Sequence, residues 1–306
     1  MNSPYHIRYL RRPAIDLQKW DACIDRSTNG LIYGRSFYLD HMTAGQWDAL
    51  VLEDYAVVLP LTWKQKAGIR YLYQPAFTQQ LGIFSPTPPP AALIEDFLAH
   101  LNIHFRFAEI FFNFQNAHPS LQAYTNFILP LDIPYTQLSA QYKKGLVKSL
   151  KLATRSSFQY IHDFDLPTAL DLNQQQYQHR TPHVRETTYR QFKELCLFLA
   201  PAGKVLLRAL TDHRQQPLAI ALLLREKDRM YLLQSTVLPA GRQTAANHLL
   251  LDHLIREFAG TPMILDFEGS EIPGIAHFYR NFGAKDQPYY FYRHNRLPWP
   301  FLLFKN

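Results

Sequence analysis

Two carboxylates and a tyrosine near the end of the chain could together move protons. Asp266 and Glu268 stand at the end of a predicted buried strand, Met263–Phe267, and Tyr279 lies in a predicted helix, Gly274–Asn281. A carboxylate at the end of a strand can take a proton from an attacking amine, directly or through water. Glu268 is the better candidate base because it follows the buried run, with a helix-capping or salt-bridge role as the alternative. Asp266 alternates with apolar residues, so a structural role also fits it.

A short loop before a predicted helix could bind a phosphorylated donor. A loop that enters a helix offers free N–H groups and the positive end of the helix dipole to a pyrophosphate. Gly241 allows close approach of the backbone, and Arg242 adds positive charge. An ordinary capped loop is the alternative interpretation. The predicted cofactor-binding residues are Ala240, Gly241, Arg242, Gln243 and Thr244.

Three further segments bear on where an anion could bind. The corresponding loop of the first half, residues 86–90, contains four prolines, which have no N–H to donate, so we expect no donor there. Arg180, Arg185 and Arg190 cluster before the sheet of the second half and could bind a phosphate or carboxylate, and Arg180 and Arg185 are the predicted substrate-binding residues. The cations of residues 144–155 recur at spacings of four, three and four, which places them on one helix face: Lys144, Lys148, Lys151 and Arg155. This face is either solvated or the wall of a groove for an anionic substrate.

The second half shows an ordered series of elements that would position these residues. Apolar runs rich in β-formers, separated by short turns, predict an antiparallel meander. Apolar residues at helical spacing then predict a helix that Thr244 caps and Phe258 ends. The predicted order is β-β-β-α-β-α-β: Lys204–Asp212, Leu218–Arg225, Met230–Val237, Thr244–Phe258, Met263–Phe267, Gly274–Asn281 and Tyr289–Tyr292.

The first half shows the same order without a repeated sequence. Its predicted elements are strands Trp47–Glu53, Ala56–Trp63 and Ile69–Tyr73, helix Ala92–Leu101, strand Ala108–Phe112, helical turn Pro119–Tyr124 and strand Phe127–Leu131. We therefore predict an α/β (α+β) fold of two tandem domains, 1–134 and 135–306, each a mixed, mostly antiparallel sheet flanked by helices. A single unrelated α/β domain is the alternative.

Composition narrows the class of protein. Hydrophobic residues make up 47% of the chain, which excludes general disorder. The net charge of +7 is uneven: residues 1–135 hold 10 Lys and Arg against 11 Asp and Glu, whereas residues 136–306 hold 22 against 14. The two cysteines, Cys23 and Cys196, have no metal-site or disulfide spacing, and no pair of the 13 histidines has convincing metal spacing. With no export signal and no apolar run long enough to span a membrane, we expect a cytoplasmic protein without a metal.

The end of the second half resembles the GNAT superfamily. The segment Leu265-Asp266-Phe267-Glu268-Gly269-Ser270, followed by Phe278-Tyr279-Arg280-Asn281-Phe282-Gly283, is similar to the strand, loop and helix near the end of FemABX and related tandem-GNAT proteins. Lys143–Ala153 is similar to the basic helix that such proteins carry before their second domain. The resemblance covers the second half well and the first half only by element order.

The resemblance implies an acyltransferase that acts on an amine. GNAT enzymes use acyl-CoA, whereas FemABX members use aminoacyl-tRNA and act on peptidoglycan precursors. The loop at Gly241 has one glycine where GNAT loops have more. FemABX-like sequences tend to carry Lys at the position of Tyr279, and CoA-dependent enzymes often carry Tyr. A phenol with a pKa near ~10 can protonate a thiolate whose conjugate acid has a pKa near ~8.5, unless the ring only packs on the sheet.

We therefore expect acyl-CoA as the donor and a small-molecule amine or a cell-wall precursor as the acceptor. Charged tRNA is the second choice of donor, and a ligand-binding module without catalysis is the alternative of another class. The sequence leaves the acceptor, the acyl chain and the oligomeric state open.

Overall fold

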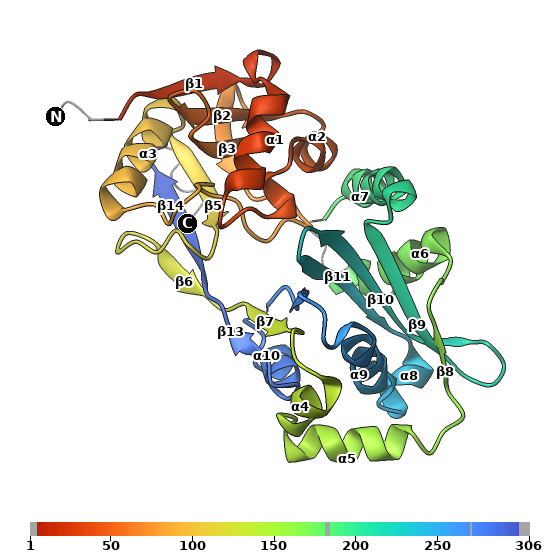
Figure 1. Cartoon of the computed structure of the whole chain (residues 1–306). Coiled ribbons are helices and arrows are strands. Elements are labelled where there is room, and N and C mark those ends of the chain that lie inside the picture. The colour runs from red at the N-terminus through yellow and green to blue at the C-terminus, as the bar shows by residue number, and fades with distance from the viewer. Residues whose placement is uncertain (1–4, 181–183, 270, 300–306) are drawn as a thin grey trace. The chain divides into compact units, whose positions relative to one another are not determined.

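The computed structural model describes residues 5–299 except 181–183 and 270, and of Arg180 it describes the backbone alone (Figure 1). The chain forms two compact units. The first comprises Met1–Tyr124 and Pro288–Asn306, and the second comprises Thr125–Gln287.

The first unit contains a seven-stranded sheet with the order β1-β2-β3-β4-β5-β14-β6 among its described residues. Neighbouring strands are antiparallel except β4 and β5, which are parallel. The strands are β1 Ile7–Arg11, β2 Trp47–Leu52, β3 Val57–Lys66, β4 Ile69–Tyr73, β5 Phe107–Phe112, β6 Gln122–Tyr124 and β14 Tyr289–Asn295.

Three helices accompany this sheet: α1 (Leu17–Arg26), α2 (Ser36–Thr43) and α3 (Ala91–His104). The buried residues of α3 recur at helical spacing and pack against alternate residues of β2, β3 and β5 to form one core. Asp16 caps α1, because its carboxylate accepts the backbone N–H groups of Gln18 and Lys19.

The second unit repeats the same strand pattern. Its described strands have the order β8-β9-β10-β11-β12-β7-β13, and only β11 and β12 are parallel. The strands are β7 Phe127–Pro130, β8 Gln159–Ile161, β9 Val205–Thr211, β10 Pro217–Glu226, β11 Arg229–Val237, β12 Ile264–Asp266 and β13 Lys285–Asp286.

The helices of the second unit cover both faces of its sheet (Figure 1). On one face, α9 (Ala246–Phe258) buries Leu250, Leu254 and their neighbours against β10 and β11, and α5 (Lys144–Ala153) packs on α9. On the other face, α6 (Leu166–Tyr177) contacts β11 and packs against α7 (Glu186–Leu199). The remaining helices are α4 (Tyr135–Ala140), α8 (Pro239–Gln243) and α10 (Pro273–Arg280).

One strand of each sheet comes from a distant part of the chain. β14, at the C-terminal end, lies between β5 and β6 in the sheet of the first unit. β7, from the middle of the chain, lies between β12 and β13 in the sheet of the second unit. The contact boundaries therefore fall at residues 124/125 and 287/288, whereas the predicted domains are 1–134 and 135–306. The reason is that β7 and β14 each pair in the sheet of the other half, an exchange that element order does not reveal.

The predicted α/β class with two mixed, mostly antiparallel sheets is confirmed. The helical turn predicted at Pro119–Tyr124 is wrong, because residues 122–124 form β6 through antiparallel pairing with Tyr289–Phe291. The helix predicted to begin at Thr244 begins after Ala245, whose φ of 54° is left-handed. Thr244 does not cap α9: it is the C-cap of α8, and its hydroxyl donates to the carbonyls of Ala240 and Gly241.

Candidate functional site

The two parallel strands of the second unit diverge after a short paired stretch. β12 pairs with β11 only along Arg229–Tyr231, and β11 continues to Val237 without β12 beside it. Divergence of neighbouring parallel strands exposes backbone N–H and C=O groups that a sheet would otherwise pair. The segment from Leu232 to Val237 therefore offers main-chain hydrogen-bonding groups to a ligand.

A β-bulge lies where the strands diverge. Gln234 pairs with Leu222 and Leu232 pairs with Leu223, so Leu233 is an extra residue without a partner in β10. The bulge changes which face the following side chains occupy. Leu232 packs in the core with α9, whereas Gln234, two residues later, lines a pocket beside α6 and α7.

The predicted donor loop forms α8 and the start of α9. The first turn of α9 has N–H groups without an intrahelical acceptor, and no side chain caps it. Arg242 and Gln243 are exposed, and the Arg242 guanidinium donates to the side-chain amide oxygen of Gln176 at 3.4 Å. The loop thus presents an exposed cationic side chain beside the N-terminus of α9.

A glycine is needed at position 241 for a different reason from the predicted approach of a phosphate. A Cβ at this buried residue would lie 2.0 Å from the carbonyl oxygen of Leu218, at the start of β10. The group that approaches the Gly241 backbone is therefore a strand of the protein itself. Glycine is required here for the packing of α8 on β10, whatever the loop binds.

Tyr279 lies in α10 within an aromatic cluster. Its ring stacks on Phe267 with the centroids 4.6 Å apart and also lies near Phe127 and Phe278. The side chain is 9% exposed, and its hydroxyl makes no hydrogen bond with the described residues. Burial raises the pKa of Tyr279, and the nearby Glu268 and Tyr177 raise it further. The phenol is therefore neutral at physiological pH and can donate a hydrogen bond.

Asp266 and Glu268 occupy different environments although they are two residues apart. Asp266 is fully buried, and both of its carboxylate oxygens have partners. Oδ1 accepts the side-chain amide of Asn126 and the backbone N–H of Glu268, both at 3.0 Å, and Oδ2 lies 2.7 Å from the guanidinium of Arg229. These contacts suit a residue that holds β7, β11 and the β12–α10 loop together.

Glu268 has a left-handed backbone, with φ at 61°. Only glycine adopts this region without cost, so the local packing must hold Glu268 in place. The following Gly269 is equally constrained, because a Cβ there would lie 2.3 Å from the carbonyl oxygen of Thr125. The half-buried Glu268 carboxylate is close enough to Tyr279 to affect its pKa.

Tyr177, at the end of α6, completes this group of side chains. Its hydroxyl accepts the backbone N–H of Val237 at 3.2 Å, which ties α6 to the end of β11. It also affects the pKa of Tyr279. Tyr177 of α6 and Glu268 of the loop after β12 thus both lie near enough to Tyr279 of α10 to affect it electrostatically, and Tyr177 contacts the end of β11.

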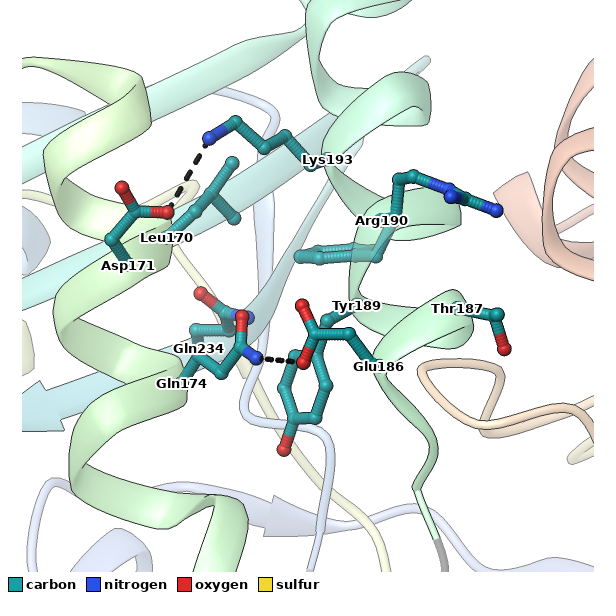
Figure 2. A pocket seen from close by; sticks show the side chains of 10 residues that line it. Leu170, Asp171, Gln174, Glu186, Thr187, Tyr189, Arg190, Lys193 and Gln234 are labelled. Atoms are coloured by element: carbon teal, nitrogen blue, oxygen red, sulfur yellow. Dashed lines mark hydrogen bonds and ion pairs between the residues drawn. The ribbon is translucent and has the colours of Figure 1, made fainter.

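A pocket of about 260 Å³ lies between α6, α7 and β11 (Figure 2). Its apolar lining consists of Leu170 and Phe192. Asp171 forms an ion pair with Lys193 at 3.3 Å across the pocket. The polar and charged residues that line it are Asp171, Gln174, Glu186, Thr187, Tyr189, Arg190, Lys193 and Gln234.

The two predicted substrate-binding arginines lie elsewhere. Arg185 is exposed at the N-cap of α7 and is not among the residues that line the pocket. The side chain of Arg180 lies outside the described residues. Arg190, one turn into α7, is the arginine that faces the pocket.

The first unit has no equivalent opening beside its parallel strands in the described residues. Beyond the end of β4, Leu81 forms a parallel bridge with Phe112 of β5, and Phe84 forms an antiparallel bridge with Val58 of β3. Both Leu81 and Phe84 are fully buried. The chain of the first unit thus fills the position that stays open beside β11 in the second.

Several residues of the site were not predicted from the sequence: Tyr177, Glu186, Leu233 and Gln234. One signal was available for two of them, since Leu232-Leu233-Gln234 breaks the alternation expected of a strand, as a bulge does. Nothing local marks Tyr177 or Glu186, because the packing of α6 and α7 brings them to the site.

The described residues contain no group of three His, Cys, Asp or Glu side chains arranged to hold a metal ion. None of the helices described is both long and apolar enough to cross a bilayer. Cys23 and Cys196 are buried, and burial raises the pKa of both thiols.

Residues 141–270 match the family model of an acetyltransferase (GNAT) domain. The second unit is a GNAT-type acyltransferase domain. The match covers α5 to the loop after β12, so it includes the diverging strands, the bulge and the predicted donor loop. No curated protein matches the sequence as a relative.

Solved structures extend the likeness to the whole chain. The structure of FemX is 13% identical, with a TM-score of 0.64 over 97% of this chain and 99% of that chain. A tandem GNAT protein from the clavulanic acid biosynthesis pathway is 11% identical, with a TM-score of 0.52 over 96% and 99%. L-PGS from Bacillus licheniformis is 10% identical, with a TM-score of 0.52 over 94% and 95%. At these identities the likeness shows the fold, and the chain has the tandem GNAT fold of the FemABX-related proteins.

Proposed function

We propose that the second unit transfers an acyl group from an acyl-CoA-type thioester to an amine. The observation that supports this most strongly is the divergence of β11 from β12 at a β-bulge, together with Glu268 and Tyr279 in the loop and helix that follow β12. A thioester placed there would meet free main-chain groups, a neutral phenol and a carboxylate. These are the three kinds of group that aminolysis of a thioester requires.

The donor would be held by the segment from α8 to the first turn of α9. A pyrophosphate suits the free N–H groups and positive dipole of a helix N-terminus, and the exposed Arg242 adds a cation. The donor supplies an activated acyl group. The protein contributes binding and orientation through residues 240–246.

The bulge would stabilise the charge that develops on the acyl oxygen. The amine nitrogen forms a bond to the carbonyl carbon, and the oxygen becomes negative in the tetrahedral intermediate. A backbone N–H of Leu233 or Gln234 is the proposed donor to that oxygen, because the bulge interrupts the pairing with β10 at this point. The carbon–sulfur bond then breaks and leaves an amide and a thiolate.

Proton movement would divide between Glu268 and Tyr279. The ammonium form of the acceptor must lose one proton before attack, and we assign this step to the Glu268 carboxylate, directly or through water. A second proton leaves the nitrogen as the amide forms. Because its pKa is raised, Tyr279 would hold its proton more tightly than an ordinary phenol and would stabilise the thiolate by donating a hydrogen bond. The thiolate would then take its proton from the nitrogen or from solvent.

The first unit supports a proposal with a single donor site. Leu81 and Phe84 occupy the equivalent position in the first unit, which argues against a second donor site there. FemX and L-PGS share the fold, so a small-molecule amine and a cell-wall precursor are both candidate acceptors.

One observation favours a second donor, a charged tRNA. Three of the four predicted cations, Lys144, Lys148 and Lys151, lie on α5, Arg155 follows in the turn after it, and all four are exposed. None of the four forms an ion pair with the described residues. A row of unpaired cations attracts a polyanion such as RNA, with an affinity that falls as salt rises.

A thermal-shift titration separates these donors. Acetyl-CoA, longer acyl-CoAs and bulk tRNA are added separately to the full chain. A ligand at 100 times its Kd stabilises the folded state by about 2.7 kcal/mol. For a domain of 150–250 residues this corresponds to about 5–11 °C in Tm. A shift with acyl-CoA and none with tRNA supports the proposal, and the reverse overturns it in favour of the tRNA-dependent reaction.

A further inference from the structure

The pocket between α6 and α7 has an amide in its wall that the protein does not satisfy. Gln234 is only 5% exposed, and its side chain makes no hydrogen bond with the described residues. Since Gln234 lines the pocket, its donors and acceptor are directed at whatever occupies that space.

Four charged residues line the pocket. Two of them pair with each other, and the other two, Glu186 and Arg190, are available to bind a ligand. Asp171 and Lys193 pair with each other. Glu186 accepts the amide of Gln174 at 2.5 Å but has no cationic partner among the described residues. Arg190 lies 3.9 Å from Glu194, and the two side chains are 69% and 59% exposed, so this pair is weak. Figure 2 shows the Glu186 carboxylate and the Arg190 guanidinium extending from α7 in different directions.

The end of the pocket at Glu186 is the end nearer the proposed reaction centre. Gln174, which holds Glu186, lies one helical turn before Tyr177 on α6. Tyr177 in turn binds the N–H of Val237 and affects Tyr279. Gln234 follows the bulged Leu233 directly in β11. A ligand that bridges Glu186 and Gln234 would thus lie close to the atoms that the bulge activates.

We propose that this pocket selects the acceptor, and that the acceptor is a small amine that also carries an anionic group. The inference rests on the proposed function. Glu186 binds the ammonium, Gln234 hydrogen-bonds the middle of the molecule, and Arg190 binds a carboxylate or phosphate. A volume of about 260 Å³ suits a molecule of amino-acid size, because pockets for drug-sized ligands begin at ~300 Å³.

Matched amines that differ by one anionic group test the proposal on the full chain. The pairs are L-lysine with cadaverine, which tests a carboxylate, and O-phosphoethanolamine with ethanolamine, which tests a phosphate. Titration calorimetry measures binding of each without a donor and again with saturating CoA. We expect the anionic member of at least one pair to bind about tenfold more tightly, and the responding pair identifies the anion.

Three variants assign the effect to the pocket. Arg190→Gln should reduce the preference within the responding pair to less than twofold, and Glu186→Gln should weaken both members about equally. Arg214→Gln, in the exposed turn between β9 and β10, is the matched control and should change neither. Arg190→Lys should restore part of the preference, which distinguishes loss of charge from loss of structure.

The results also separate this inference from the proposed function. If CoA binds but no amine shows a preference that Arg190→Gln removes, the pocket inference is overturned while the donor site remains. If the anionic amine binds and acetyl-CoA does not, the pocket is supported and the thioester donor fails. Equal binding of both members of each pair overturns the role of Arg190.

Discussion

Replacement of Gly241 by Ala should destabilise the second unit, whereas the same change at Gly145 should not. The added Cβ would lie 2.0 Å from the carbonyl oxygen and 2.7 Å from the carbonyl carbon of Leu218. Both atoms belong to the backbone of β10, so no side-chain rotation can relieve the contact. The N–H of Leu238 donates to the same carbonyl at 2.9 Å, and that bond must lengthen if α8 moves away.

The expected cost combines overpacking with the weakened hydrogen bond. Overpacking costs about 1–3 kcal/mol, and a backbone hydrogen bond contributes about 1 kcal/mol. The total of about 2–4 kcal/mol corresponds to about 4–16 °C in Tm for a domain of 150–250 residues. Because α8 moves, the affinity for acetyl-CoA should fall as well, measured by calorimetry at a temperature where both proteins are folded.

Gly145→Ala is the matched control. Gly145 lies in α5, and a Cβ there would meet no atom within 4 Å. Alanine is preferred to glycine in a helix by up to ~1 kcal/mol, so this variant should keep or raise the Tm. Equal stability of the two variants would refute the packing role of Gly241. Normal stability of Gly241→Ala with lost CoA binding would return this glycine to a direct role at the phosphates.

Three more predictions address the site residues. Asp266→Asn removes the anion beside the buried Arg229 and should lower the free energy of unfolding by about 3–5 kcal/mol, measured by urea denaturation. Asp286→Asn, in an exposed pair, should lower it by under ~1 kcal/mol. Equal losses would contradict the structural role of Asp266. Tyr279→Phe should lower kcat about 100-fold with an unchanged Kd for the donor, and unchanged turnover with chemistry rate-limiting would assign the ring to packing. Burial lowers the pKa of His248 below its ordinary value of ~6.5, so the unfolded chain binds more protons in this range and stability should fall as the pH drops from 7 through the folded-state pKa. His248→Phe should make this decline shallower in denaturant titrations at pH 7 and 5, and an identical decline would contradict the assignment.

Local pattern was enough to predict most strands, because apolar runs and turns mark them directly. The meander from residue 204 to 237 matches β9, β10 and β11 to within a residue or two at each end. The partners of β7 and β14 could not be predicted. Their sequences specify extended chain, and the choice of sheet depends on pairing between residues far apart in the chain, such as Phe291 with Phe111 and Leu265 with Leu129.

The candidate site was predictable only in part, for a similar reason. The segments that contain Tyr279, Glu268 and the donor loop carry sequence signals of their own. The role of Asp266 depends on Asn126 and Arg229, which reach it from other strands, so the sequence could not separate a base from a structural carboxylate. Gly241 shows the same limit, since the sequence marks a close approach there but does not say that Leu218 is the approaching group.

Transfer of a labelled acyl group tests the proposed activity of the second unit. The full chain is incubated with acetyl-CoA labelled with ¹³C in the acetyl group and with the amine that binds best, and the products are analysed by mass spectrometry. We expect a ¹³C-labelled amide and one equivalent of free CoA, formed about 100-fold more slowly by the Tyr279→Phe protein. Binding of acetyl-CoA without any labelled amide, or transfer that occurs only from charged tRNA, would contradict it.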